Sequence, residues 1–308
     1  MKYYLLKNGD IVAVSARGIF ILADKEWYPT FGSITEVDLH AGEQITEEQL
    51  DKLLAKQKAK EARAKKSIFV DRISTGATEI DLSINGAMYL SSIPVIKSLL
   101  DGQMININSP VTFFVGDNGT GKSTLLEAIA IAVGYNAEGG GKNFDFETRN
   151  THSGFHGILR VSRIRPPKDG FFLRAESFYN LASNVDDLGV SRYYGGRSLH
   201  NQSHGESFMA LVKNRFFGNG LYILDEPEAA LSPNRIIDLM KEIKRLVDAR
   251  SQFIIATHSP ILMTYPDAQI FELTENGIFE KRYYELQSFL LTREFLNDPE
   301  MMLRELLE

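Results

Sequence analysis

Apolar and polar positions change their period along the chain, and these changes predict where strands and helices lie. Near the start, short alternating runs at 3–6 and 11–14 flank Asn8-Gly9, which is a strong turn signal. These runs are expected to pair as a β-hairpin. Residues 18–22 give a third strand, and Trp27, Tyr28 and Phe31 offer apolar side chains for a miniature core.

A charged, alanine-rich stretch separates this small β unit from the rest of the chain. Thr46 and Gln49 have the spacing of a capping box that starts a helix, and residues 55–66 offer only alanine as an apolar face. A solvated linker helix is the simpler interpretation, and a basic arm for nucleic acid or a partner is the alternative. We therefore expect a small β unit with a linker helix at 1–66 and a larger domain at 67–308.

The larger part alternates buried-type strands with amphipathic helices, which is typical of an α/β fold. A pair of strands is expected around Pro166-Pro167, with its arginines, Arg174 among them, on a solvent face. The other expected strands are 68–70, 79–84, 111–115, 221–224, 253–256 and a hairpin within 270–284 turning at Asn276-Gly277. The expected helices are 91–100, 125–133, one that begins after Ser203, 233–248 and a closing segment at 287–308 interrupted near Pro299.

One stretch between a strand and a helix has the pattern of a phosphate-binding loop. Residues 116–124 read GDNGTGKST and fit G-x-x-x-x-G-K-[S/T]. Glycines let successive backbone N–H groups surround phosphates, and the following helix adds the positive end of its dipole. Lys122 has the length to reach the outer phosphates, and the Ser123 hydroxyl suits Mg²⁺.

Acidic and histidine side chains follow two of the predicted strands. Asp225 and Glu226 come directly after the run 221–224, and His258 comes after 253–256. In open α/β sheets ligands bind at the carboxyl ends of strands. Asp225 is therefore expected in the Mg²⁺ shell, and Glu226 is expected to orient or deprotonate a water.

Composition and charge limit the classes of function. The chain has 308 residues, 44% hydrophobic and 24% charged, with no cysteine and a formal net charge of −6. No apolar run approaches the ~20 residues that span a bilayer. We expect a cytoplasmic protein without a membrane partner. The net charge gives no case for DNA as a partner, although the arginines near Pro166 leave it open.

Taken in order, these motifs resemble those of the ATP-binding-cassette (ABC) ATPase superfamily over roughly residues 67–285. The loop is similar to the family's G-x-N-G-x-G-K-S-T form, and Ser203-His204-Gly205-Glu206 resembles its signature motif, usually S-G-G-Q. The resemblance implies a P-loop NTPase head with a mostly parallel core sheet, a short helical subdomain and ATP with Mg²⁺ as cofactors. The residues implied to bind ATP are Gly116, Asn118, Gly119, Thr120, Gly121, Lys122, Ser123, Thr124, Ser203 and Gly205.

The resemblance also implies roles and partners. Glu226, His258 and Lys122 are expected to be catalytic, and Ser123, Asp225 and Glu176 are expected at the metal. Two copies would bind ATP head to tail, with Ser203 and Gly205 gripping the nucleotide of the opposite subunit. The expected protein is thus an ATP-dependent homodimer that hydrolyses ATP as a switch for an unidentified protein effector or a nucleic-acid process.

Departures from the family pattern point to one branch. The Q-loop glutamine is not obvious, and Glu176 is the nearest residue; Ser232 replaces the D-loop aspartate. The forms Asp225 to Glu228 and Thr257 to Pro260 look more like stand-alone and genome-maintenance ATPases than transporter subunits. The alternatives are a transporter's ATP-binding subunit and a non-hydrolysing, ATP-dependent scaffold or sensor.

Overall fold

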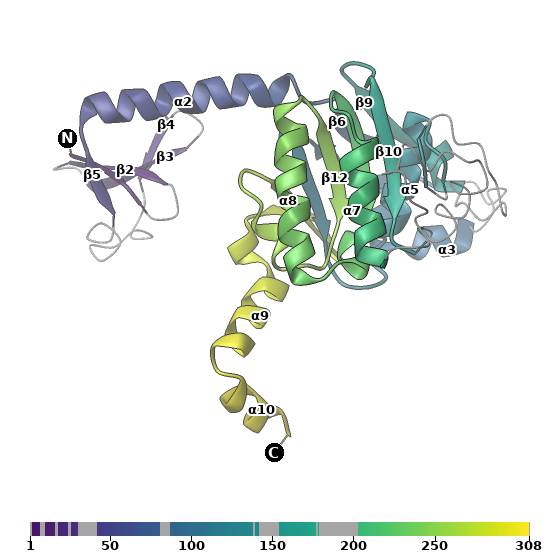
Figure 1. Ribbon diagram of the computed structural model, residues 1–308. Helices are drawn as coiled ribbons and strands as arrows, with labels where there is room; N and C mark the ends of the chain where they lie inside the picture. Colours follow the sequence, from purple (N-terminus) through teal and green to yellow (C-terminus); the bar gives the residue numbers. More distant parts are fainter. Residues whose placement is uncertain are drawn as a thin grey trace. The chain divides into compact units, whose positions relative to one another are not determined.

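The protein was analysed as a computed structural model, in which two compact units lie at Met1–Arg63 and Ala64–Glu308 (Figure 1). The structure describes residues 2–6, 10–15, 18–23, 26–29, 42–80, 87–137, 139–141, 154–176, 178 and 203–307. The expected turn at Asn8-Gly9, the core residue Phe31, the end of the 79–84 strand and the short helical subdomain between 176 and 203 lie outside these residues.

The first unit is an antiparallel sheet followed by a helix. Its strands take the order β4-β3-β2-β1-β5, and β1 pairs with β2 so that Tyr3 faces Ala13. The predicted hairpin is therefore confirmed. Thr46 and Gln49 form the predicted capping box at the start of the helix, and Ile11, Ile45 and Leu50 form a small buried core. The elements are β1 (Lys2–Leu5), β2 (Ile11–Ser15), β3 (Gly18–Ala23), β4 (Glu26–Pro29), β5 (Glu43–Ile45) and α2 (Glu47–Lys65).

The second unit is built on a mostly parallel sheet with the order β10-β11-β12-β8-β13-β14. The first five strands are parallel to their neighbours, and β14 is antiparallel to β13. The carboxyl ends of β8, β10, β11 and β12 consequently meet at one edge of the sheet. The strands are β8 (Val111–Val115), β10 (Asp169–Arg174), β11 (Gly220–Asp225), β12 (Gln252–Ala256), β13 (Gln269–Thr274) and β14 (Gly277–Lys281).

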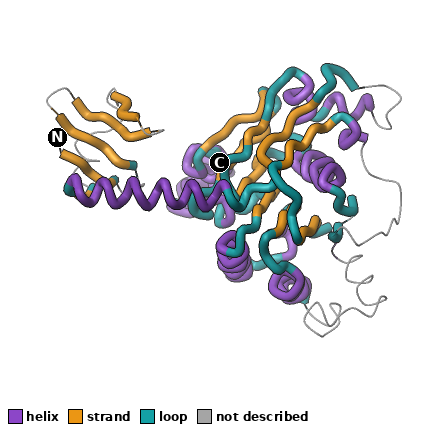
Figure 2. Tube along the Cα trace, turned by 90° about the horizontal axis from the view of Figure 1, so that it is seen from above, coloured by secondary structure: helices purple, strands orange, loops and turns teal. Residues whose placement is uncertain are grey.

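Helices cover both faces of this sheet (Figure 2). Alternate residues of each strand point to opposite faces, so Phe113 joins one buried cluster while Phe114 joins the other. The first cluster packs α7 (His204–Arg215) and α8 (Pro233–Asp248) on the sheet, and the second packs α4 (Pro94–Leu100) and α5 (Lys122–Val133). This layering explains why the strand sequences are continuously apolar rather than alternating.

A three-stranded antiparallel sheet, β7-β6-β9, corrects one prediction. The runs around Pro166-Pro167 do form strands, but β9 pairs with β6 and β10 pairs with β11, so the two do not form a hairpin. Local pattern cannot distinguish these pairings, because both strands are short and half apolar. The strands are β6 (Val70–Thr75), β7 (Ile105–Asn106) and β9 (Leu159–Arg163).

The predicted helix at 91–100 is split in two. One helix, α3 (Ala87–Ser92), ends before Ile93, and α4 begins at Pro94. Ile93 has φ −75° and ψ 122°, as expected because a proline disfavours helical geometry in the residue before it.

The end of the chain follows the predicted pattern. The β13–β14 hairpin pairs Thr274 with Gly277. The closing helical segment is interrupted as expected, into α9 (Gln287–Asn297) and α10 (Pro299–Leu307). Four short 3-10 turns complete the described elements: η1 (Gly154–Gly157), η4 (Pro227–Ala230), η5 (Leu262–Thr264) and η6 (Tyr283–Glu285).

Candidate nucleotide site

The loop between β8 and α5 depends on its glycines. Gly116, Gly119 and Gly121 have φ of +142°, +85° and +97°, a region that other residues rarely adopt. A Cβ on Gly121 would lie 2.3 Å from Ile93 Cγ2, and one on Gly116 would lie 2.3 Å from the Leu273 carbonyl oxygen. The loop therefore turns tightly, as a phosphate cradle requires. No side chain caps the first N–H groups of α5, which leaves them for an anion.

Lys122 is buried at the start of α5, and its ammonium is held by the loop itself. Nζ donates to the carbonyl oxygens of Gly116 at 2.9 Å and Asp117 at 3.0 Å. Burial lowers the pKa of Lys122, while the neighbouring carboxylates, led by Glu226 and Asp225, oppose that shift. The lysine thus lies folded over the loop, with its ammonium bound to loop carbonyl oxygens.

Ser123 joins the loop to the strand-end acids. Its hydroxyl donates to Asp225 Oδ1 at 3.0 Å, across 102 positions of sequence. Asp225 is 5% exposed. Burial raises the pKa of Asp225 to about 6, although Arg174 and the Ser123 hydroxyl lower it. The predicted serine–aspartate pair is brought together because β8 and β11 end at the same edge of the sheet.

Glu226 and His258 lie beside each other at the same edge. His258 Nε2 is 3.5 Å from Glu226 Oε1, and both side chains are partly exposed. Glu226 has φ +49° and ψ +54°, a left-handed conformation that is uncommon outside glycine and asparagine. Its backbone N–H donates to the Ala256 carbonyl at 3.0 Å, which fixes this conformation. Strained residues of this kind concentrate at functional sites.

Glu228 is a site residue that the sequence analysis did not select. One of its carboxylate oxygens, Oε1, accepts a hydrogen bond from the backbone N–H of His258. The other oxygen, Oε2, is buried and has no hydrogen-bond partner in the structure. Glu228 thus ties the turn after β11 to the turn after β12. Its place three residues after Asp225 was the available signal in the sequence.

Arg174 corrects a second prediction. Instead of lying on a solvent face, its side chain is 21% exposed and reaches into the site, with Nε 3.4 Å from Asp225 Oδ2. Arg174 ends β10 and is paired with Asp225 in the strand register. Because the pairing of β10 with β11 is long-range, the sequence pattern gave no signal for this contact. Glu176 lies near Arg174, at 3.7 Å, and the structure does not bring its exposed carboxylate to Ser123.

Ser203 and Gly205 lie at the start of α7, beside the turn that follows β11. Ser203 is the N-cap, as predicted, and forms a capping box with Glu206. A Cβ on Gly205 would lie 3.2 Å from the carbonyl oxygen of Ala230, so α7 begins close to η4. Glu206 also lies 3.4 Å from Arg235 of α8. The remaining loop residues, Asn118 and Thr124, lie within the loop and the first turn of α5.

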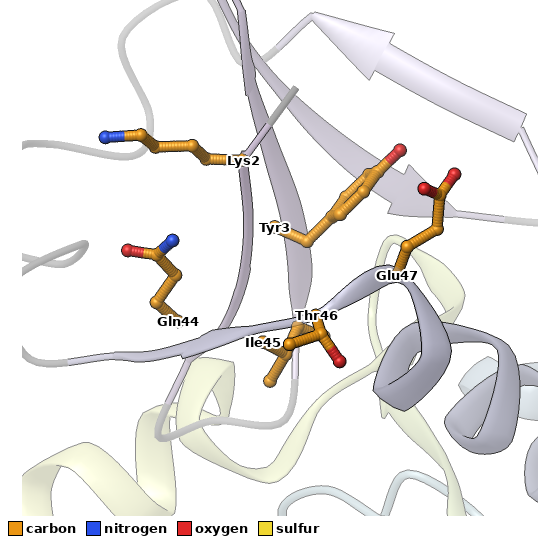
Figure 3. Close-up of a pocket in the computed structure, with 6 residues that line it drawn as sticks. All are labelled: Lys2, Tyr3, Gln44, Ile45, Thr46 and Glu47. Carbon is orange, nitrogen blue, oxygen red and sulfur yellow. The ribbon is translucent and has the colours of Figure 1, made fainter.

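A pocket of about 360 Å³ lies in the first unit between β1, β5 and the start of α2 (Figure 3). Its lining is mostly polar: Lys2, Tyr3, Gln44, Ile45, Thr46 and Glu47. Among the described residues, no group of three or more histidine, aspartate or glutamate side chains is arranged to hold a metal ion.

Two protein-family models match the chain. A model described as an AAA domain matches residues 92–169, which contain the loop. A second AAA domain model, whose description also names the AbiEii toxin and a type IV TA system, matches residues 205–264. The second range contains Asp225, Glu226 and His258, so the two matches together cover the loop and these three residues, whereas Arg174 lies between the matched ranges.

Individual proteins are similar over longer ranges but at low identity. The ABC transporter ATP-binding/permease protein Rv1747 of Mycobacterium tuberculosis is 26% identical over 278 residues, which cover 80% of this chain. The chain spans 30% of that protein's length. Among solved structures, cbiO1 from Clostridium perfringens, part of the ABC transporter complex cbiONQ, is 17% identical over 76% of this chain and 97% of its own, with a TM-score of 0.42. The SMC head domain from Thermotoga maritima is 16% identical over 70% of this chain and 99% of its own, with a TM-score of 0.37.

Among the described residues, no helix is both long and apolar enough to cross a bilayer. The loop lies within the stretch 92–169 and the strand-end acids lie within 205–264, the two stretches of this chain that match AAA domain models.

Proposed function

We propose that this protein binds ATP with Mg²⁺ at the Gly116–Thr124 loop and hydrolyses it. The observation that carries the proposal is the 3.0 Å contact between Ser123 Oγ and Asp225 Oδ1. This contact joins the Gly116–Thr124 loop to the acid at the end of β11. Glu226 follows Asp225 in the chain, and its carboxylate lies 3.5 Å from His258. Phosphoryl transfer uses a loop that binds phosphates, oxygen ligands for a metal ion and a residue that positions the nucleophile. The loop, the Ser123–Asp225 pair and Glu226 beside His258 supply such groups.

The donor set at this edge suits Mg²⁺. Hydroxyl and carboxylate oxygens are the ligands that this ion prefers, and it is usually held by one or two protein groups together with phosphate oxygens and water. Ser123 and Asp225 would hold it. When bound, Mg²⁺ supplies positive charge that offsets the charge of the phosphates. Glu176 stays a predicted ligand, although its carboxylate faces Arg174 in this structure.

The chain's own residues account for the remaining steps. Lys122, which now donates to two loop carbonyls, would turn to the outer phosphates of ATP. Glu226 would accept a proton from a water whose oxygen bonds to the γ-phosphorus. The bond from the γ-phosphorus to the bridging oxygen breaks, and ADP leaves with that electron pair. His258, 3.5 Å from Glu226, would hold this carboxylate in position.

The site is proposed to be completed by a second copy of the chain. Ser203 and Gly205 lie at the start of α7, where Ser203 and His204 are exposed, and a helix N-terminus is a suitable place to bind a phosphate group presented by another subunit. ATP would then hold two copies together, and its hydrolysis would release them. Such a cycle acts as a switch for a separate effector or a nucleic-acid process.

The test is Glu226→Gln, which keeps the size of the side chain but removes the base. We expect ATP turnover to fall by about 10²-fold or more, with ATP binding retained. Light scattering should find a doubled mass for this variant only when ATP and Mg²⁺ are both present. Glu275→Gln, in the exposed β13–β14 turn, is the matched control and should behave as the wild type.

Three results would count against parts of this proposal. A wild-type protein that neither binds nor hydrolyses ATP with Mg²⁺ contradicts the whole of it. Equally slow hydrolysis by wild type and Glu226→Gln favours the non-hydrolysing scaffold instead. A mass that does not change with ATP argues against Ser203 and Gly205 as part of a shared site.

A second candidate is the ATP-binding subunit of a membrane transporter. The specific support is the 26% identity to the M. tuberculosis protein, whose name describes an ABC transporter ATP-binding/permease protein. Stable co-purification with a membrane protein of several spans, lost on mutation of the surface that binds it, would favour this candidate over the switch.

A further inference from the structure

Arg174 meets three carboxylates at the edge of the sheet where ATP is proposed to bind. Its Nη1 donates to Glu127 Oε2 at 3.0 Å. Its Nε lies 3.4 Å from Asp225 Oδ2, and Nη2 lies 3.7 Å from Glu176 Oε2. The side chains of Glu127 and Asp225 are only 13% and 6% exposed. The attraction between Arg174 and these two carboxylates is therefore only weakly screened by solvent.

The two oxygens of Asp225 have different neighbours. Oδ1 accepts the Ser123 hydroxyl, whereas Oδ2 faces Arg174. The Nε atom of Arg174 is buried and makes no hydrogen bond, so Asp225 and Arg174 are held by attraction between charges. The close hydrogen bond of Arg174 goes to Glu127, which lies four residues after Ser123 on the same face of α5. The guanidinium is thus anchored to the helix that carries Ser123, and its contact with Asp225 is the looser one.

Negative side chains surround the phosphate loop. Four carboxylates lie close enough to Lys122 to act on its charge, namely Glu226, Asp225, Asp117 and Glu228. ATP brings further negative charge into this space. At distances of several ångströms and in a partly buried site, each unit charge changes the affinity for an anion severalfold or more. Arg174 supplies positive charge beside Asp225, one of these four carboxylates.

We propose that Arg174 is a charge-compensating residue of the nucleotide site, which offsets Asp225 and lets ATP phosphates enter before a divalent cation is bound. The proposal rests on the proposed function, ATP binding at the same loop. Arg174 and the divalent cation are both positively charged, and they compete for interaction with the Asp225 carboxylate. Arg174 therefore strengthens the binding of metal-free nucleotide and weakens the gain that Mg²⁺ brings.

Removing the charge of Arg174 should weaken the binding of metal-free nucleotide and increase the gain in affinity that Mg²⁺ brings. Arg174→Met keeps the length of the side chain without its charge. Binding of nucleotide in EDTA should weaken about tenfold, because repulsion from Asp225 is no longer offset. The gain in affinity on adding Mg²⁺ should become larger, because the cation no longer competes with a guanidinium at Asp225. Arg174→Lys should restore part of the metal-free affinity.

The experiment measures the affinity of the full-length protein for a fluorescent, non-hydrolysable ATP analogue, mant-AMPPNP, in EDTA and in saturating MgCl₂. The dissociation constant in EDTA divided by that in MgCl₂ is expected to rise about tenfold in Arg174→Met. Arg163→Met, which removes an exposed arginine of β9, is the control and should leave the ratio unchanged. Arg174→Met also removes the guanidinium that offsets the charge of Glu127. The double variant Arg174→Met with Glu127→Gln is therefore measured alongside.

The outcomes separate this inference from the proposed function. Equal weakening in EDTA and in MgCl₂, with an unchanged ratio in both the single and the double variant, means that Arg174 has only a structural role and overturns the inference. In that case the wild type still binds the analogue, so the proposed function stands. If the wild type binds the analogue under neither condition, both the proposed function and this inference are wrong.

Discussion

At the scale of single residues, the loop glycines differ in what a side chain would meet. Gly119 and Gly121 both have positive φ, +85° and +97°. A Cβ on Gly119 would meet nothing within 4 Å, whereas one on Gly121 would lie 2.3 Å from Ile93 Cγ2 and 2.6 Å from Val95 Cγ1. Both neighbours are buried. Gly119 is therefore required only for its backbone conformation, and Gly121 also for the space it leaves.

This difference predicts unequal effects of alanine at the two positions. Gly119→Ala should lower the free energy of unfolding by about 1–2 kcal/mol, the cost of a left-handed conformation. Gly121→Ala should lower it by a further amount of about 1–3 kcal/mol, because Ile93 and Val95 must shift in a packed core. Urea unfolding without nucleotide measures both values. Equal losses would mean that the helix before the loop moves aside at little cost.

At the scale of elements, one buried carboxylate joins β10, β11 and α7. Asp169 Oδ2 accepts from the Tyr222 hydroxyl at 2.7 Å and from the Phe217 N–H at 3.1 Å, and Oδ1 accepts from Arg215 at 2.8 Å. Burial by itself would raise the pKa of Asp169, but the hydrogen bonds from Tyr222, Arg215 and Phe217 outweigh it and hold the pKa below the ordinary value of 3.8. The ionised carboxylate thus fixes the amino end of β10, at the other end of the strand from the proposed nucleotide site.

A lowered pKa gives the sign of a pH effect. Because Asp169 binds its proton less tightly in the folded protein, its stabilising contribution is present above pH 3.8 and is lost as the pH falls below that value. Asp169→Asn should therefore lower the free energy of unfolding by about 2 kcal/mol at pH 7. The difference from wild type should shrink below pH 3.8. Urea unfolding at pH 7 and at pH 3 tests this, and a loss that is equal at both would mean that shape rather than charge matters.

At the scale of the whole molecule, the chain divides into two units, each with a buried core of its own. The first is centred on Ile11, Ile45 and Leu50. The second has two clusters, one on each face of its parallel sheet, and contains every residue proposed to bind ATP.

This division predicts that nucleotide binding does not need the first unit. A chain that begins at Ala64 should bind mant-AMPPNP with MgCl₂ within about twofold of the full-length affinity, because its cores and its site are made within residues 64–308. Far-ultraviolet circular dichroism confirms that the shortened protein is folded. A folded protein with binding weakened more than tenfold would contradict the independence of the two units.

Features that depend on residues close together along the chain can be predicted from the sequence alone. The loop conformation follows from glycines at fixed spacing, the helix starts follow from Thr46 and Ser203, and the break before α10 follows from Pro299. Asp225 ends one continuous apolar run, and His258 follows another. These runs predict that both side chains lie at the ends of strands. In each case the physical cause acts within a few positions of the chain, so a local pattern records it.

Which strand ends lie side by side, in contrast, is a property of the whole fold. The runs on either side of Pro166-Pro167 belong to different sheets, and that pairing turns Arg174 from an expected surface residue into a neighbour of Asp225. The contact of Glu228 with the backbone of His258 likewise joins residues 30 positions apart. Strand order is set by how whole faces pack into a common core, a sum over many distant contacts that no short stretch of sequence contains.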